Sequence, residues 1–130
     1  MYVLDTNTVI YFFKEMGQVK AKIRTIDPKE IALPTVVLYE LYVGLEKSKN
    51  SQSRRKALQI LSSKSTIIPF DQKAAKAAGQ VRARLESMGQ PIGPIDTLIA
   101  GMAIAQDATL ITHNVKEFSR VEGLLVEDWY

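Results

Sequence analysis

The sequence predicts an α/β fold in which helices flank a central, mostly parallel sheet of about five strands. Three observations support this prediction. Short apolar runs alternate with longer segments of helical composition, which is the pattern of strand–helix–strand units. Turn-forming residues separate these segments, and the chain contains no linker, repeat or low-complexity tract. Its 130 residues are the size of one domain, so we expect a single domain over residues 1–130.

Five short apolar runs are expected to form the strands. Each is three or four residues long, and together they are rich in the branched side chains that strands favour. Runs that are apolar throughout indicate strands buried on both faces, as in a parallel sheet. In chain order the runs are residues 2–4, 31–33, 66–69, 109–112 and 124–126.

Helices are expected between these runs, and several carry a signal at one end. The second helix stops at Asp27-Pro28, because proline disfavours a helical conformation in the residue before it. Pro34 stands near the first turn of the third helix, where its missing N–H is not needed. Asp71 caps a long helix, and residues 89–94 form a rigid turn into the last one. The expected helices cover residues 9–13, 19–26, 36–47, 51–62 and 71–88, with a sixth around Asp96.

Composition excludes several classes of protein. The chain has no cysteine, which excludes disulfides, thiol catalysis and cysteine-bound zinc. Its longest apolar stretch, Leu98 to Ala105, is too short to span a bilayer. The first residues lack the basic segment and long apolar run of a secretory signal. We therefore expect a cytoplasmic protein without a membrane segment.

Charge is distributed unevenly along the chain. The net charge is only +3, but residues 14–84 hold fifteen Lys and Arg against six Asp and Glu. The remainder holds two basic residues against eight acidic ones. This asymmetry suggests that the basic part attracts an anionic partner, although a solvated helical surface would have the same composition.

Three acidic residues stand in apolar or turn-forming sequence without a basic neighbour. They are Asp5, Glu40 and Asp96, and no Lys or Arg lies within four residues of any of them. Removing an unpaired carboxylate from water costs several kcal/mol, so such groups usually bind metal, pair over long range or line a wet site. The pattern indicates a site built from carboxylates.

The predicted topology brings these acids toward one edge of the sheet. Asp5 follows the first strand and Asn114 follows the strand at residues 109–112. Ligands of parallel α/β sheets bind beyond the carboxyl ends of the strands, where the strand order reverses. Asp96 begins a helix, and the turn before it can carry it to the same edge.

Each acid also has a purely structural explanation. Asp5 and Asp96 both precede apolar helical sequence and could cap a helix, although a capping carboxylate keeps one oxygen free. Glu40 lies in the middle of a helix, where a structural role would require a Lys or Arg partner from elsewhere in the chain.

Converging carboxylates repel one another unless a cation neutralises them. Oxygen ligands without cysteine or clustered histidine favour Mg²⁺ or Mn²⁺. Such centres activate water and hold a phosphodiester for in-line attack. A carboxylate centre beside a basic surface therefore indicates phosphodiester hydrolysis.

Four segments resemble the motifs of PIN-domain ribonucleases, and the match extends over residues 2–129. The ending, with Trp129, resembles more narrowly the VapC toxins of bacterial toxin–antitoxin pairs. "DTN" alone is a weak signal, whereas the ordered set is specific. The segments are Leu4-Asp5-Thr6-Asn7, Glu40 with Gly44, the run from Gly89 to Ala100, and the run from Leu110 to Phe118.

The resemblance implies a three-layer fold and an endoribonuclease that depends on Mg²⁺, for which Mn²⁺ can substitute. It implies RNA as substrate (tRNA in several relatives), a VapB-type antitoxin as inhibitor, and a homodimer. Carried over, Asp5 and Asp96 are the metal ligands, and Glu40 acts through a bound water or a second ion. Thr6 and Asn7 would hydrogen-bond these ligands.

One position departs from the family pattern. Many PIN domains carry a fourth acid after the last core strand, where this chain has Asn114. An amide can orient water or coordinate through its oxygen, but it adds no negative charge. We therefore expect weak binding of a single metal ion in the absence of substrate.

Other residues near the expected site have weaker signals. His113 is the only histidine and could serve as a general base, but a solvent-facing loop position is the better expectation. Tyr39 and Tyr42 flank Glu40 and are expected to pack or to form a dimer contact. Contacts with RNA phosphates, or simply a solvated helix face, are expected for Lys73, Lys76, Arg82 and Arg84.

Two other functions compete with the nuclease. A phosphotransfer domain would use Asp5 as nucleophile, but that scheme requires a second Asp where this chain has Asn7 and a Lys near Asn114. A non-catalytic module of the same fold would bind nucleic acid or protein. All three acids are present, which favours the nuclease.

Overall fold

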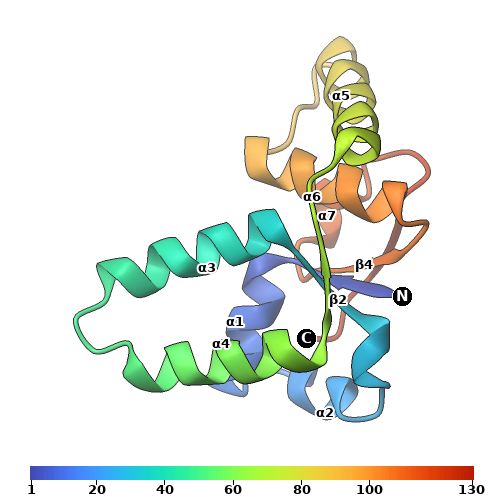
Figure 1. Ribbon diagram of the computed structural model, residues 1–130. Coiled ribbons are helices and arrows are strands. Elements are labelled where there is room, and N and C mark those ends of the chain that lie inside the picture. The colour runs from blue at the N-terminus through green and yellow to red at the C-terminus, as the bar shows by residue number, and fades with distance from the viewer.

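The computed structural model describes all 130 residues and contains a five-stranded sheet in which every neighbouring pair is parallel (Figure 1). The predicted sheet is confirmed, and four of the five strands begin at the predicted residue. The strands are β1 (Tyr2–Leu4), β2 (Ile31–Pro34), β3 (Thr66–Ile68), β4 (Thr109–Ile111) and β5 (Leu125–Glu127).

The strand order reverses direction at β1. The order across the sheet is β3-β2-β1-β4-β5, so the chain builds outward from β1 on one side and then crosses to add β4 and β5 on the other. Leu4 of β1 is in register with Ile111 of β4. The carboxyl ends of β1 and β4 therefore meet at the reversal, which is the position where such sheets bind their ligands.

Seven α-helices and one 3₁₀ turn surround the sheet. The predicted second helix ends earlier than expected, at Ile23, because the next residues tighten into three-residue turns, with Ile26 N–H bonded to the Ile23 carbonyl at 3.0 Å. The short elements η1 and α7 were not predicted. The helices are α1 (Thr6–Lys14), α2 (Val19–Ile23), η1 (Pro28–Glu30), α3 (Thr35–Lys47), α4 (Gln52–Lys64), α5 (Gln72–Ser87), α6 (Pro94–Ala105) and α7 (Val115–Phe118).

Two helix pairs flank the sheet at opposite ends of the molecule. Helices α3 and α4 form an antiparallel pair that projects away from the sheet, whereas α5 and α6 pack together beyond it (Figure 1). The core between these layers is almost entirely aliphatic and includes most of α6. Trp129 is buried against Tyr2, so the last residues are packed onto the first strand. None of the helices is both long and apolar enough to cross a membrane.

Candidate active site at the carboxyl edge of the sheet

Asp5 stands where β1 passes into α1, and it is 6% exposed. Its backbone N–H donates to the carbonyl of Ile111 at 3.2 Å, which continues the pairing of β1 with β4. Its Oδ1 accepts from the backbone N–H of Thr8 at 2.9 Å, so Asp5 caps α1 as expected. No hydrogen bond uses its Oδ2, so the cap leaves one carboxylate oxygen for a ligand.

Glu40 is half-buried in the middle of α3 and is held by Thr6. The Thr6 hydroxyl donates to Glu40 Oε1 at 2.5 Å, across 34 positions of sequence. No salt bridge involves Glu40, so the structural explanation that required a Lys or Arg partner is wrong. Hydrogen bonding to a neutral hydroxyl leaves the negative charge of Glu40 in place.

Asp96 lies in the first turn of α6 and is half-buried. The helix is capped by Gly93, and the Asp96 side chain makes no capping bond, so the capping explanation is wrong for this residue. Helix α6 is positioned by its close packing against α5. A Cβ atom added at Gly101 would lie 2.6 Å from the Cα of Ala78, so only glycine permits this separation.

The electrostatics of the site converge on Asp96. The pKa of Asp96 is raised from 3.8 to about 6, and burial is the largest cause. The negative charges of Asp5, Glu117 and Glu40, in decreasing order, are the other causes of this rise. The three predicted acids therefore act on one another, together with a fourth that was not predicted.

Glu117 is this fourth acid. It lies on the single turn α7 just after β4, is half-buried, and accepts a hydrogen bond from the Asn114 amide at 2.8 Å. Asn114 is itself fixed by a bond of 3.0 Å from its N–H to Thr112 Oγ1. Asn114 itself adds no negative charge, as expected, but Glu117 brings one to the site one turn later. The sequence contained a signal for this charge, because Asn114 and Glu117 are three residues apart and side chains at that spacing share one face of a helix.

The four carboxylates suit a divalent cation chemically. None of them forms a salt bridge, so no basic side chain offsets their repulsion. Oxygen donors carrying net negative charge are those that Mg²⁺ and Mn²⁺ prefer. In this structure, no group of three or more Asp, Glu or His side chains has the spacing needed to hold a metal ion. The site therefore has the donor chemistry of a metal centre without a closed set of ligands.

Comparison with known proteins agrees with this geometry. The family model described as "PIN domain" matches residues 2–124. This chain belongs to the PIN-domain family. Within that family it groups with the VapC ribonucleases, which match it over nearly their whole length. Ribonuclease VapC2 of Rickettsia felis is 38% identical and covers 99% of this chain and 98% of its own. The tRNA(fMet)-specific endonuclease VapC of Shigella flexneri is 34% identical, covering 98% and 97%.

Solved structures of VapBC complexes have the same fold as this PIN domain. VapBC2 from Rickettsia felis, bound to a DNA fragment from their promoter, superposes with a TM-score of 0.91 at 37% identity, covering 99% of this chain and 98% of that one. DNA-bound VapBC from Salmonella typhimurium gives a TM-score of 0.92 at 32% identity, with the same coverage. The predicted three-layer PIN fold is thereby confirmed.

Asn7 and His113, which were also considered from the sequence, make no side-chain hydrogen bond to the four acids of this PIN-domain site. Asn7 is exposed at the start of α1, and no hydrogen bond of its side chain ties it to the acids. His113 is exposed in the loop after β4, as expected, and pairs through Nδ1 with Asp128 at 2.9 Å. Its ring stacks on Tyr130 with a centroid separation of 4.2 Å. His113 is therefore turned toward the C-terminal segment.

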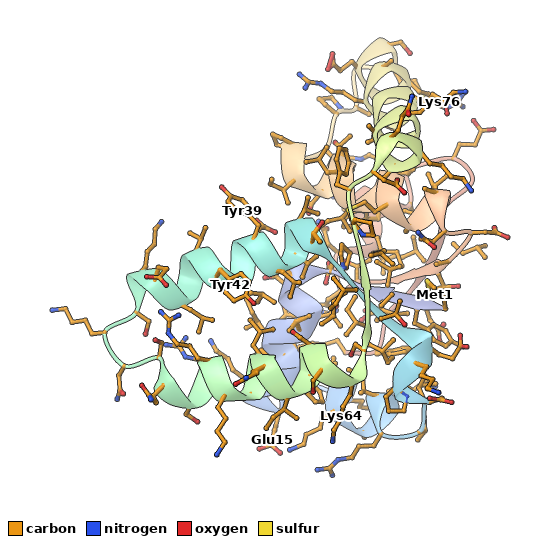
Figure 2. All side chains as sticks on the ribbon, viewed as in Figure 1. Met1, Glu15, Tyr39, Tyr42, Lys64 and Lys76 are labelled. Atoms are coloured by element: carbon orange, nitrogen blue, oxygen red, sulfur yellow. The ribbon has the colours of Figure 1, made fainter.

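The four basic residues considered for RNA contacts all lie on α5 and are exposed. Arg82 is paired with a glutamate one turn later at 2.6 Å, and Arg84 is paired with Glu122 at 2.7 Å. Lys73 and Lys76 form no salt bridge. Figure 2 shows Lys76 projecting from the side of α5 that faces away from α3. Of the four, only the two lysines have no ion-pair partner.

Proposed function

We propose that this protein is a Mg²⁺-dependent endoribonuclease toxin that hydrolyses RNA phosphodiesters, with Mn²⁺ able to replace Mg²⁺. The observation that carries the proposal is the group of four carboxylates at the strand-order reversal. None has a basic partner, and three of them act on the pKa of the fourth. Membership of the VapC ribonucleases supports the same conclusion.

The residues have distinct roles in this proposal. Asp5 and Asp96 would hold the metal, which when bound supplies Lewis-acid activation of water and neutralises phosphate charge. Glu40 is fixed by Thr6 so that its second oxygen can accept a hydrogen bond from the attacking water. Glu117 adds negative charge that strengthens cation binding, and Asn114 holds its carboxylate in place.

Because Glu117 is present, the argument for a single weakly bound metal ion no longer applies. That expectation depended on three acids, and the site contains four whose charges interact. We propose that the additional carboxylate raises the affinity for a first ion. The number of ions is measured directly by titrating the RNA-free protein with Mn²⁺.

The proposed partners are RNA and a VapB-type antitoxin. A relative named tRNA(fMet)-specific endonuclease is 34% identical over nearly the whole chain, so tRNA is the first class of RNA to test. The structural neighbours are VapBC complexes, which supports inhibition by an antitoxin of the VapB type. We propose that the protein acts in the cytoplasm, where RNA and a protein antitoxin would be available to it.

We further propose that the protein is a homodimer through α3. Tyr39, Tyr42 and Val43 share one face of this helix and are 59%, 51% and 37% exposed, so the tyrosines do not pack within the chain. Figure 2 shows Tyr39 projecting from the side of α3 that faces away from α4. Replacing both tyrosines by serine should give a monomer in light scattering, whereas Leu125→Ser, at another exposed apolar position, should not.

Cleavage assays on purified protein test the activity. Wild-type protein should cleave tRNA with Mg²⁺ or Mn²⁺ and not with EDTA. Asp5→Asn and Asp96→Asn should each lower the cleavage rate by about a thousandfold or more, because each removes a negative charge from the ion site. Glu127→Gln, which removes an exposed charge on β5, is the matched control. Cleavage in EDTA would refute the proposal, and RNA binding without cleavage would instead support the non-catalytic module.

A further inference from the structure

A small cavity opens beside Glu40, between α1, α3 and α4. It measures about 170 Å³, and Glu40 forms part of its lining. An apolar cavity of roughly 150 Å³ holds one benzene ring in other proteins. The cavity can therefore accept a single aromatic ring system, and it does so next to a carboxylate that also belongs to the acidic site.

The walls of this cavity are apolar and its rim is cationic. Five side chains form the walls, and two basic residues, Lys14 and Arg54, lie at the rim. Neither cation forms a salt bridge, and Arg54 bonds only to the hydroxyl of Ser48. The cavity is thus suited to a molecule with a flat apolar body and an anionic group. The wall residues are Ile10, Phe13, Leu41, Leu45 and Leu58.

Gly44 lines the same cavity, and the fold itself does not require a glycine there. It lies in the middle of α3, where glycine is less favourable than alanine. Its φ is not positive, and a Cβ added to it would meet no atom within 4 Å. Gly101 differs, because packing against Ala78 excludes any side chain. The absence of a side chain at position 44 leaves the cavity open one turn after Glu40.

We propose that this cavity is a nucleotide subsite that receives the base next to the scissile phosphodiester, with Lys14 and Arg54 holding that nucleotide's own phosphate. This proposal rests on the proposed ribonuclease function. Single-stranded RNA is recognised through unstacked bases that lie against aromatic and apolar side chains. Phe13 and the aliphatic walls supply that surface. Because Glu40 lines the cavity and also belongs to the acidic site, a base in the cavity would lie next to the phosphodiester that is cleaved.

The contacts favour a nucleotide over a protein segment as occupant. The walls come from three helices, whose interior backbone groups are bonded within each helix. The cavity therefore offers no row of free N–H and C=O groups to an extended peptide. Two unpaired cations at one rim and a ring-sized apolar interior match the two parts of a nucleotide.

A titration of the metal-free protein tests the subsite without relying on catalysis. The four nucleoside 5′-monophosphates are added in EDTA while backbone and methyl NMR signals are recorded. At least one nucleotide should shift the signals of Phe13, Leu45 and Leu58. Gly44→Leu should weaken that binding by about tenfold or more, because its side chain fills the cavity. Gly79→Leu is the matched control, since Gly79 also lies inside a helix with no atom within 4 Å of an added Cβ.

Cleavage kinetics provide the second test. The double variant Lys14→Gln with Arg54→Gln should raise KM for RNA by about tenfold and change kcat little, since charge-assisted contacts with a flanking phosphate bind the substrate equally before and during reaction. Lys56→Gln, on the solvent side of α4, should change neither. Thermal unfolding shows whether each variant is folded. If Gly44→Leu is not folded, Gly44→Ala takes its place as a smaller obstruction of the cavity.

The outcomes separate this proposal from the ribonuclease itself. If wild-type protein fails to cleave RNA, the proposed function fails, and the nucleotide titration still decides whether the cavity binds a nucleotide. An unchanged KM for both Gly44→Leu and the double variant would overturn the subsite. So would a result in which Gly44→Leu abolishes binding of an antitoxin peptide but leaves nucleotide binding intact.

Discussion

The hydroxyl of Thr6 donates a 2.5 Å hydrogen bond to Glu40 Oε1 and so joins the start of α1 to the middle of α3. Thr6 follows Asp5 directly, so a single turn after β1 places one acid and fixes another. The bond leaves Glu40 Oε2 free while restricting the rotation of its side chain. The arrangement of two acids therefore depends on one uncharged side chain.

Thr6→Val should lower kcat/KM for RNA cleavage by roughly ten- to a hundredfold, as loss of a residue that orients a metal-site carboxylate typically does. The free energy of unfolding should change by only about 1 kcal/mol, the net worth of one hydrogen bond. Thr6→Ser keeps the hydroxyl and should restore most of the activity. Equal activity of the valine and serine variants would show that the bond does not position Glu40.

Asp96→Asn should stabilise the metal-free protein near neutral pH. The pKa of Asp96 in the folded state is about 6, above its ordinary value of 3.8. The folded state therefore binds this proton more tightly than the unfolded state, and stability falls as pH rises between these two values. After allowance for solvent screening, the variant should gain about 1 kcal/mol at pH 7 and almost nothing at about pH 4.

Urea unfolding in EDTA at the two pH values measures this effect, with Glu127→Gln as a variant that removes an exposed charge elsewhere. Saturating Mn²⁺ should reverse the order, because the ion stabilises the wild type by binding its folded state. A destabilised Asp96→Asn protein at neutral pH would contradict the cost of burying a charged Asp96 beside other acids, which the raised pKa indicates.

Glu117→Gln should weaken Mn²⁺ binding by about tenfold, because it removes one of the charges that act on Asp96 and keeps the side-chain volume. Calorimetric titration of the RNA-free protein measures the affinity. Glu122→Gln is the comparison, since Glu122 is exposed and already paired with Arg84. Indistinguishable affinities for the two variants would exclude Glu117 from the site.

Gly101→Ala should lower the free energy of unfolding by about 1–3 kcal/mol, because its methyl group would overlap the Ala78 backbone on α5. Gly79→Ala, at an open helical position, should instead raise stability by up to about 1 kcal/mol through helix propensity. Chemical unfolding of both proteins checks the opposite signs. Equal effects would mean that the two helices can separate without cost.

The fold was predictable because its signals are local. The strands are continuous apolar runs, and proline and aspartate mark several helix ends in the sequence itself. The second helix was predicted too long because apolar residues continue past Ile23 into a turn. The turn α7 was missed because four residues are too few to show helical periodicity.

The site was predictable only in part, because its acids could be recognised in the sequence only by the absence of a nearby basic residue. Asp5, Glu40 and Asp96 have no basic neighbour in sequence, and this could be read directly. Glu117 follows Lys116 directly, so the same criterion passed over it. The bond between Thr6 and Glu40 joins positions 34 apart and depends on the crossing of two helices, which no local pattern reveals.

The crossover from the β3 side of the sheet to β4 has a consequence for biosynthesis. The residues that complete the acidic group lie on α6 and α7, the helices that precede and follow β4 in the chain. Synthesis proceeds from the N-terminus, so a ribosome-bound chain that has emerged only through α5 holds two of the four carboxylates. The acidic group is therefore complete only after the final third of the chain has left the ribosome.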